Sequence, residues 1–268
     1  MLRITKIEPE PFHTLGYRTA GPKGKPIHVQ LPFHRAEAEG LPSSVQALVL
    51  TSDLQGRETG PQNRLLGCAL ADELVALHNK GIIPRPNLIA LCGDLYEYPD
   101  CHKRGGTGPV DEVFCALSNA CDQVVGVLGN HDELARRDTV NAPNISILDG
   151  TYSSVLGLRI GGVSGIIGDP KRHLRRSEDE FLKRLESLTN KSPNLLLLHQ
   201  GPDDPELSRR GDPSVRLSLE TGYAGLTVFG HTRWHGYPLI TLGSGQALNV
   251  DGRVIIVTPS GIESSPNR

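Results

Sequence analysis

Short apolar runs alternate with helical patterns from residue 47 onward. Five segments begin as continuous apolar runs and lead into polar turns, at 47–50, 87–94, 123–132, 194–202 and 226–234. Uninterrupted apolar runs of this kind predict strands that are buried on both faces. Between the first two runs, leucines spaced three or four residues apart share one face of a helix expected over 63–80. This alternation of strands and helices predicts a parallel α/β sheet.

The remaining apolar patterns extend this arrangement. A second helix is expected near 110–120, and a third begins at Ser177, because Glu180 stands three residues further on, as in a capping box. The segment 155–168 predicts paired strands joined by glycines. Residues 238–257 predict an antiparallel meander of three short strands with glycine turns. The whole pattern predicts two packed sheets with helices outside them.

The two ends of the chain differ from this pattern. Residues 1–46 carry six prolines and few periodic apolar positions, so we expect an irregular N-terminal extension with one strand near 27–31. The repeating pattern defines a single domain over 47–258. The last residues, 259–268, predict a frayed C-terminal tail.

Composition and charge exclude several classes of protein. The 28 basic residues nearly balance the 30 acidic ones, and the formal net charge of −2 predicts no binding to bulk nucleic acid. No apolar run approaches the roughly 20 residues of a membrane-spanning helix, and the first residues lack the apolar stretch of a signal peptide. The five cysteines form no CxxC pair, so we expect reduced thiols rather than a framework of disulfides. We therefore expect a cytoplasmic protein without membrane contact, whose oligomeric state the sequence does not define.

Five chemically active side chains follow the predicted strands. Asp53, Asp94, Asn130, His199 and His231 each stand where an apolar run ends. In open α/β sheets, ligands bind beyond the carboxyl ends of the strands, so these side chains should meet at one rim. A Gly-Asp pair or a single histidine at such a place is usually an ordinary turn. All five in succession predict a shared metal site, and their donors suit Mn, Fe and Zn.

These motifs carry a resemblance to a known family. In order, the chain contains Asp53-Leu54-Gln55, Gly93-Asp94, Gly129-Asn130-His131-Asp132, His199 and Gly230-His231-Thr232-Arg233. Over about residues 46–257 it therefore resembles the calcineurin-like metallophosphoesterases, whose pattern is D-x-H, GD, GNH[DE], a strand-end His and G-H-x-H. The resemblance implies a four-layer α/β/β/α sandwich with two mixed sheets flanked by helices. It also implies hydrolysis of a phosphate ester by a metal-bound hydroxide.

The resemblance also implies a ligand set. Asp94 would bridge two divalent ions, and one of these ions would be held by Asp94, Asn130, His199 and His231. The implied cofactors are one or two ions of Mn, Fe or Zn per chain. Such ions neutralise phosphate charge and lower the pKa of a water between them.

Two further roles follow from the same resemblance. His131 would face the phosphoryl group and assist the leaving oxygen, work that suits an imidazole near neutrality. Asp132 would orient the ring of His131, although Asp94 could compete for that place. Asn130 would contact the substrate and stabilise the developing negative charge.

The ligands of the second ion depart from the family pattern. They should be Asp53, the bridging Asp94 and two histidines, but the chain has Gln55 and Arg233 at the histidine positions. Glutamine can ligate through its amide oxygen, and a D-x-Q variant is similar to the manganese-dependent ADP-ribose/CDP-alcohol diphosphatases. A guanidinium has no lone pair to offer. We expect Arg233 to clamp the substrate phosphate and the second ion to be weak or absent, unless His235 replaces the missing ligand.

These expectations favour an enzyme that acts on a small phosphorylated substrate. A phosphodiester or a nucleotide diphosphate fits Arg233 better than a phosphoprotein, because the arginine can neutralise a second phosphate. Tyr96 and Tyr98 could stack on a base, and the basic cluster at 171–176 could steer an anion. The alternative is a non-catalytic module that binds a metal or a nucleotide without turnover. The intact Gly-Asn-His-Asp motif favours the enzyme.

Overall fold

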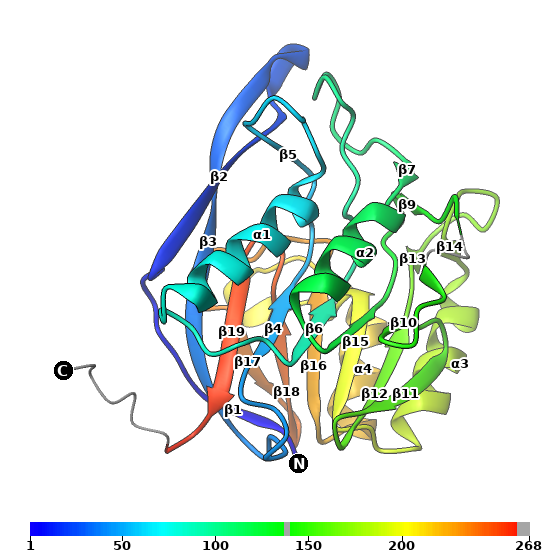
Figure 1. The fold of residues 1–268 in the computed structure, drawn as a ribbon. Helices are drawn as coiled ribbons and strands as arrows, with labels where there is room; N and C mark the ends of the chain where they lie inside the picture. The colour runs from blue at the N-terminus through cyan, green and yellow to red at the C-terminus, as the bar shows by residue number, and fades with distance from the viewer. Residues whose placement is uncertain (137–139, 262–268) are drawn as a thin grey trace.

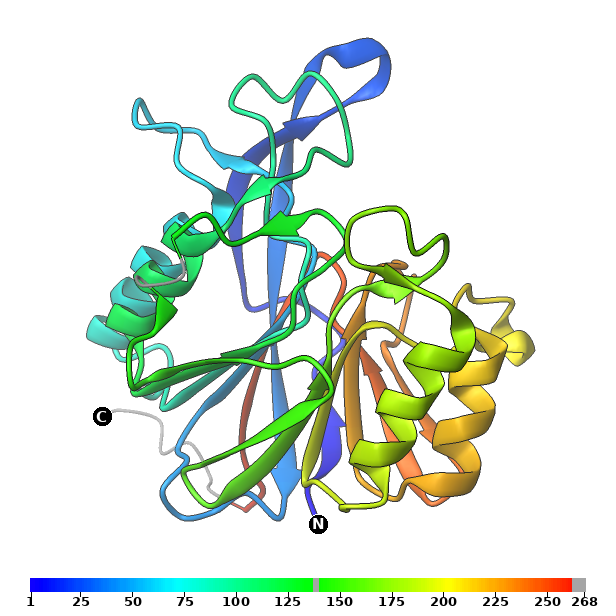
Figure 2. The same cartoon turned by 90° about the vertical axis from the view of Figure 1, so that its right-hand side faces the viewer.

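The chain folds into four layers. In the computed structural model, which describes residues 1–136 and 140–261, a nine-stranded and a six-stranded sheet pack face to face. Helices α1 (Leu66–Asn79) and α2 (Asp111–Ala120) cover the outer face of the larger sheet (Figure 1). Helices α3 (Glu178–Thr189) and α4 (Pro213–Gly222) cover the smaller sheet, and Figure 2 shows the four layers side by side. The predicted α/β/β/α sandwich with two mixed sheets is confirmed.

The larger sheet contains the parallel strands from the first part of the chain. Its strands are β1 (Arg3–Ile7), β2 (His13–Ala20), β3 (Pro26–Glu39), β4 (Leu48–Thr51), β5 (Arg57–Glu58), β6 (Leu88–Leu91), β8 (Gln123–Gly126), β10 (Ile145–Ile147) and β19 (Val254–Pro259). They follow the order β10-β8-β6-β4-β19-β3-β2-β5, with β1 paired to β3. Every residue of β4 and β6 is buried, as their continuous apolar runs predict.

The smaller sheet has a parallel centre and antiparallel edges. Its strands are β11 (Thr151–Val155), β12 (Leu158–Val163), β15 (Leu195–Gln200), β16 (Leu226–Gly230), β17 (Leu239–Leu242) and β18 (Gly245–Asn249). Their order is β11-β12-β15-β16-β18-β17. The strand pair expected over 155–168 is only partly correct: β12 lies in this range, but it pairs with the preceding β11 across a turn at Gly157, which has a φ of 82°. At that φ a residue with a Cβ would be strained.

Three apolar clusters hold the layers together. Between the sheets, Leu50 and Leu88 of the larger sheet lie in one cluster with Leu197 and Val228 of the smaller one. A second cluster lies under α1 and α2, and a third lies under α3 and α4. Short elements complete the fold: η1 (Pro22–Gly24), β7 (Gly108–Pro109), β9 (Asp132–Glu133), β13 (Ile166–Ile167), β14 (Arg175–Arg176) and η3 (Pro205–Leu207).

The N-terminal extension is not irregular, contrary to the prediction. Residues 1–46 supply β1, β2 and β3, and β3 pairs with both β2 and β19 inside the larger sheet. The prolines of this segment interrupt the apolar pattern, so the sequence predicted an irregular chain. Pro26 is nevertheless the first residue of β3, where the missing N–H of a proline costs little. The β2–β3 hairpin projects beyond the sandwich next to the loop 96–109 (Figure 2). Arg104 of that loop donates to the carbonyl of Ala20 at 2.9 Å.

The meander expected over 238–257 is only partly correct. β17 and β18 pair antiparallel, but β18 lies parallel to β16, and β19 crosses to the larger sheet between β4 and β3. Both faces of a crossing strand can be buried, and Val254–Val257 are all buried. Of the tail expected at 259–268, Pro259 is the last residue of β19, and 262–268 lie outside the described residues.

Candidate metal centre

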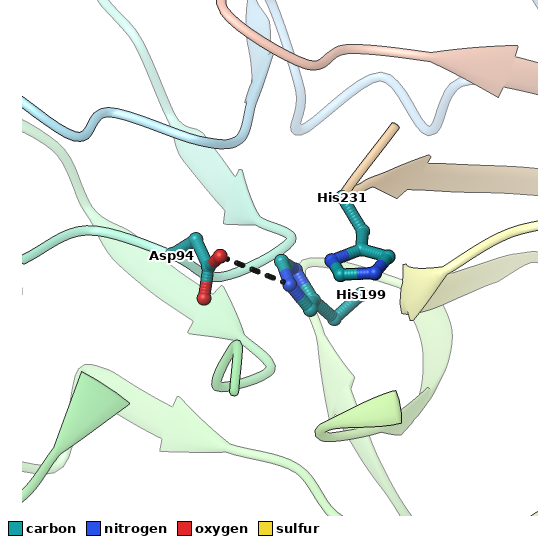
Figure 3. A group of neighbouring side chains, drawn as sticks. All are labelled: Asp94, His199 and His231. Atoms are coloured by element: carbon teal, nitrogen blue, oxygen red, sulfur yellow. Dashed lines mark ion pairs between the residues drawn. The ribbon is translucent and has the colours of Figure 1, made fainter. Parts of the chain in front are cut away.

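Strand ends bring the predicted site residues together. Asp53 follows β4, Asp94 follows β6 and Asn130 follows β8, whereas His199 lies near the end of β15 and His231 directly follows β16. The ligand atoms of Asp94, His199 and His231 all lie within 4.8 Å of one another. Figure 3 shows these three side chains gathered from separate strand ends. The rim predicted from the strand-end pattern therefore contains a compact cluster of metal-binding groups.

Two buried polar atoms at this cluster lack partners. His199 is fully buried, and its Nδ1 donates to the carbonyl of Cys92 at 2.7 Å. The other ring nitrogen, Nε2, lies 3.4 Å from Asp94 Oδ2. Nε2 of His199 and Oδ1 of Asn130 have no hydrogen-bond partner among the described residues. Buried polar groups are nearly always paired. Open carboxylate, amide and imidazole donors therefore fit the divalent ion that the family pattern implies.

The three residues of the cluster differ in charge. Burial disfavours the charged form of His199, but the Asp94 carboxylate outweighs it and raises the pKa of His199 to about 10. Burial, and then the charge on His199, lower the pKa of His231 to about 4. Burial alone would raise the pKa of Asp94, yet His199 holds it below its ordinary value. A ligating imidazole must be neutral, so an ion would replace the proton of His199.

Two glycines allow the loops after β6 and β8 to approach each other. Gly93 has a φ of 87°, and a Cβ at this position would overlap the backbone nitrogen of Gly129. A Cβ at Gly129 would overlap the carboxylate of Asp94. The glycines of the two motifs are thus required by backbone packing, which places the Asp94 carboxylate against the next loop.

Asp53 lies beside the cluster but is already bonded. Its Oδ2 accepts hydrogen bonds from the backbone nitrogen of His231 at 2.9 Å and from the hydroxyl of Ser52 at 2.7 Å. Burial raises the pKa of Asp53 well above its ordinary value, and the carboxylate of Asp251 adds to the rise. A cation next to this carboxylate would stabilise its charged form.

Gln55 contacts the carboxylate of Asp94. Its Nε2 donates to Asp94 Oδ2 at 3.3 Å. Within residues 1–136 and 140–261, the compact cluster of histidines and acids does not include Asp53. The donors expected at the second position are therefore close to the first position but less tightly gathered.

Sequence reasoning missed Asp251. It follows β18, and it pairs with Ser52 in a parallel bridge at the rim. Burial raises the pKa of Asp251 to about 6, although the charge of Arg233 opposes the rise. The signal was present in the sequence, because β18 is one more apolar strand that leads to an acidic residue.

His131 is half-buried beside the cluster. Its backbone N–H donates to Asp94 Oδ1 at 3.1 Å, and its ring Nδ1 lies 3.4 Å from Thr107 Oγ1. Gly105 packs directly on the ring, so the loop 96–109 forms a wall over His131. Burial lowers the pKa of His131 below its ordinary value.

Asp132 does not orient the ring of His131, contrary to the prediction. Its two carboxylate oxygens accept from the backbone N–H groups of Asp94, Leu95 and Gly129, at 2.7, 2.7 and 2.8 Å. Asp132 is fully buried, and these donors satisfy it. It therefore fastens the loops after β6 and β8 to each other, which positions Asp94 and Asn130.

Arg233 shares a cavity with His231 of the cluster. It is exposed, and together with His231 it lines an open cavity of about 770 Å³. His235 is also exposed and lines this cavity. It does not belong to the cluster of Asp94, His199 and His231 in the described part of the chain.

The other candidates lie at the border of the site. Tyr96 packs on Gly108 and Tyr98 packs on Gly106, so both rings contact their own loop. In the basic cluster 171–176, Arg176 is buried and forms an ion pair with Asp149 at 2.6 Å. The neighbouring Arg175 is different, because its charge contributes to the lowered pKa values of His131 and His231.

One of three comparisons with known proteins identifies a family. A scan of protein families matches residues 47–233 to the family described as calcineurin-like phosphoesterase. A search of curated proteins found no match. Among solved structures, the protein TT1561 of Thermus thermophilus is 21% identical with a TM-score of 0.55, over 76% of this chain and 88% of that one. A phosphopantetheinyl hydrolase from Mycobacterium tuberculosis is 12% identical with a TM-score of 0.47, over 78% of this chain and 89% of that one.

The likeness to TT1561 shows a shared fold. The family match spans well over half of the chain, and it includes every strand-end residue from Asp53 to His231. None of the helices within residues 1–136 and 140–261 is long and apolar enough to cross a membrane. Because of the family match over residues 47–233, the chain belongs to the calcineurin-like phosphoesterase family and is a metal-dependent phosphoesterase.

Proposed function

We propose that this phosphoesterase hydrolyses a small phosphodiester or nucleotide diphosphate with the help of manganese or a similar divalent ion. The observation that carries the proposal is a pair of buried atoms beside Asp94 and His231, His199 Nε2 and Asn130 Oδ1, which have no hydrogen-bond partner within residues 1–136 and 140–261. These four residues would hold the first ion. When bound, such an ion neutralises phosphate charge and lowers the pKa of a bound water.

The chain's own side chains would do the rest of the work. His131 would donate a proton to the leaving oxygen, because an anionic phosphoryl group beside the ring favours its charged form. The wall formed by Gly105 and Thr107 supports this ring. The amide group of Asn130 would stabilise the developing negative charge. Arg175 and Arg233 would attract an anionic substrate to the rim.

A second ion would have a weaker set of ligands. Asp53, Gln55 and the bridging Asp94 would hold it, and His235 or a water would complete the set. Gln55 already lies against Asp94, which supports a position next to the first ion. Arg233 disfavours a second cation and would contact substrate phosphate instead.

The cysteines support a reducing compartment. Cys68, Cys92, Cys101 and Cys121 are buried free thiols. Buried free thiols are typical of proteins from the cytosol, so we propose that the enzyme acts in the cytoplasm.

Hydrolysis of bis-p-nitrophenyl phosphate with added manganese tests the function. The wild type should release p-nitrophenol and retain about one tightly held ion per chain after dialysis. Asp94→Asn should lose both the activity and the ion, whereas Asp179→Asn, an exposed acid paired with Lys183, should retain both. If the wild type binds manganese but hydrolyses no phosphate ester, the chain is a binding module instead.

A further inference from the structure

The open cavity beside His231 has a basic wall. It has a volume of about 770 Å³, and its lining includes Arg209, Arg210 and Arg233 as well as His231. Two of these arginines belong to the loop between β15 and α4, which the sequence analysis did not interpret. We call the three arginines the basic subsite. Because His231 belongs to the metal cluster, the subsite adjoins the place where the scissile phosphate would lie.

The guanidinium groups of the subsite are poorly compensated. Arg210 and Arg233 are exposed, and neither side chain forms a hydrogen bond or an ion pair within the described residues. Nη1 of Arg209 is buried without a hydrogen-bond partner among those residues. The carboxylate oxygen nearest to it, Asp204 Oδ2, lies 3.6 Å away. Because this atom is buried in an ion pair with Asp204, the guanidinium donors open to a ligand are those of Arg210 and Arg233.

The loop that carries these arginines is held in place. Trp234 is buried, and its Nε1 donates to the carbonyl of Arg210 at 2.8 Å. The backbone groups of Asp204 and Arg209 bond each other at 3.1 and 2.8 Å. Arg209 also lies over the Trp234 ring, with its Cζ 5.1 Å from the ring centroid. The basic subsite is therefore built on a fixed framework.

Charge decides which ligand such a wall selects. Asp204 partly offsets Arg209, and Asp251 partly offsets Arg233, but no carboxylate is paired with Arg210 in the described residues. The chain as a whole is slightly acidic, so its net charge does not favour anions and any selection of an anion must come from local groups such as these arginines. Guanidinium groups bind phosphate oxygens in pairs of hydrogen bonds.

We propose that the basic subsite binds a second phosphate group of the substrate, next to the phosphate that is cleaved. This inference rests on the proposed function and narrows its substrate class to esters of diphosphate. A simple phosphodiester would leave Arg210 without an anionic partner. A diphosphate ester would place one phosphate at the metal cluster and the other between the arginines.

Pyrophosphate binding to metal-free protein tests the subsite separately from catalysis. Trp234 is the single tryptophan of the chain and lies in the cavity wall, so its fluorescence should report binding there. In the presence of a chelator, pyrophosphate should cause a saturable change and bind at least tenfold more tightly than inorganic phosphate. Arg210→Ala should weaken pyrophosphate binding by roughly tenfold, the usual worth of a charge-assisted hydrogen-bond pair.

Two variants sharpen this experiment. Arg210→Lys keeps the charge but loses the paired geometry, so its affinity should fall between those of the wild type and Arg210→Ala. Arg3→Ala removes an exposed arginine of β1 and should leave pyrophosphate binding unchanged. The proposal is overturned if neither fluorescence nor calorimetry detects saturable pyrophosphate binding. It is also overturned if Arg210→Ala binds pyrophosphate like the wild type.

Kinetics with manganese separate this inference from the proposed function. For the bis(p-nitrophenyl) ester of diphosphate, with one aryl group on each phosphate, Arg210→Ala should raise KM at least fivefold more than it does for bis-p-nitrophenyl phosphate. An equal effect on both substrates would contradict the second-phosphate role. If the wild type hydrolyses neither compound, the proposed function fails, while the pyrophosphate titration still decides on the subsite.

Discussion

The two metal positions proposed at this rim are built from the same kind of strand end, yet they differ in how complete they are. At the first position, the ligand atoms of Asp94, His199 and His231 already lie within 4.8 Å of one another, and in the described part of the chain one atom each of His199 and Asn130 is buried without a hydrogen bond. At the second position, Asp53 already accepts two hydrogen bonds from within the chain. Strand ends alone therefore do not make a metal position; they need donors that the protein leaves open.

Charge adds to this difference. At the first position, the carboxylate of Asp94 lies beside His231, which is neutral, and His199, whose proton an incoming ion would replace. The second has the carboxylates of Asp53 and Asp251 but also the guanidinium of Arg233, whose charge acts on Asp251. A fixed positive charge beside a cation site costs binding energy, and the cost grows where water is excluded. The comparison predicts one tight ion and one weak ion.

Removal of a ligand from the first position should have the largest effect. His231→Ala deletes an imidazole of the compact cluster, so the affinity for the tight ion should fall by more than about 100-fold. Hydrolysis of bis-p-nitrophenyl phosphate should fall with it. Asp53→Ala removes a proposed ligand of the second position and one acceptor of the His231 backbone N–H, so it should weaken binding of the tight ion far less than His231→Ala does. Elemental analysis after dialysis measures both, and equal metal loss in the two variants would break the comparison.

His131 should affect turnover without affecting metal binding. Since its ring contacts Thr107 and Gly105 rather than the cluster, His131→Ala should keep the tight ion. Turnover should slow by roughly 10²–10⁴, the range for a positioned proton donor. The measurement is kcat at saturating manganese together with metal content. Loss of the ion in this variant would make His131 a ligand and exclude the proposed role.

The pH dependence of metal affinity should show a single competing proton. The pKa of His199 is raised to about 10, so this imidazole is charged at neutral pH and must lose its proton to bind an ion. The pKa of His231 is lowered to about 4, so His231 does not compete above about pH 5. The association constant should therefore rise about tenfold per pH unit between about pH 6 and 9.

Calorimetry in buffers of different ionisation enthalpy provides the check for this prediction. One proton should be released for each ion bound in that range. Release of two protons would mean that both histidines are charged in the free protein, and release of none would mean that His199 is already neutral.

Asp132 should affect stability more than chemistry. Its oxygens accept from three backbone N–H groups, and the amide of Asp132→Asn would turn a donor toward at least one of them. The free energy of unfolding should fall by about 2 kcal/mol, the cost of a buried unpaired group. Asp72→Asn, in an exposed pair with Arg64, should cost less than about 1 kcal/mol. Urea unfolding compares the two, and an unchanged midpoint for Asp132→Asn would argue against the fastening role.

The sequence predicted the sandwich best where burial alone decides. The continuous apolar runs of β4, β6 and β15 required strands covered on both faces, and the structure has them. It predicted β2 and β3 poorly, because the prolines on both sides of β2 and within β3 suggested an irregular chain. The helix α4 was missed, since only Val215 and Leu219 of it are buried. Its N-cap at Asp212, followed by Pro213, was a signal that could have found it.

The site residues divide in a similar way. Strand ends fixed the positions of Asp94, His199 and His231, because parallel strands finish at one rim. Sequence spacing did not fix where the Asp132 carboxylate points, since the conformation of the loop decides that direction. Asp251 follows a strand outside the five motifs, and Arg210 comes from a segment with no motif. Their roles depend on pairings between distant strands and loops, which one sequence does not define.

The smallest expected effect concerns the second position. Arg233→His would put an imidazole where the family pattern has one, next to Asp53, Gln55 and Asp94. Wild type should hold about one ion tightly, and Arg233→His should approach two per chain. Arg233→Ala removes the charge without adding a ligand, so it separates the two causes and should improve affinity for the second ion by only a few-fold. Elemental analysis gives the stoichiometry, and calorimetry gives the affinity of the weaker ion. If the wild type already holds two ions tightly, or if Arg233→Ala gains as much as Arg233→His, the second position does not lack an imidazole. His235 or a water would then complete it, and the two positions would be more alike than the geometry of the free site indicates.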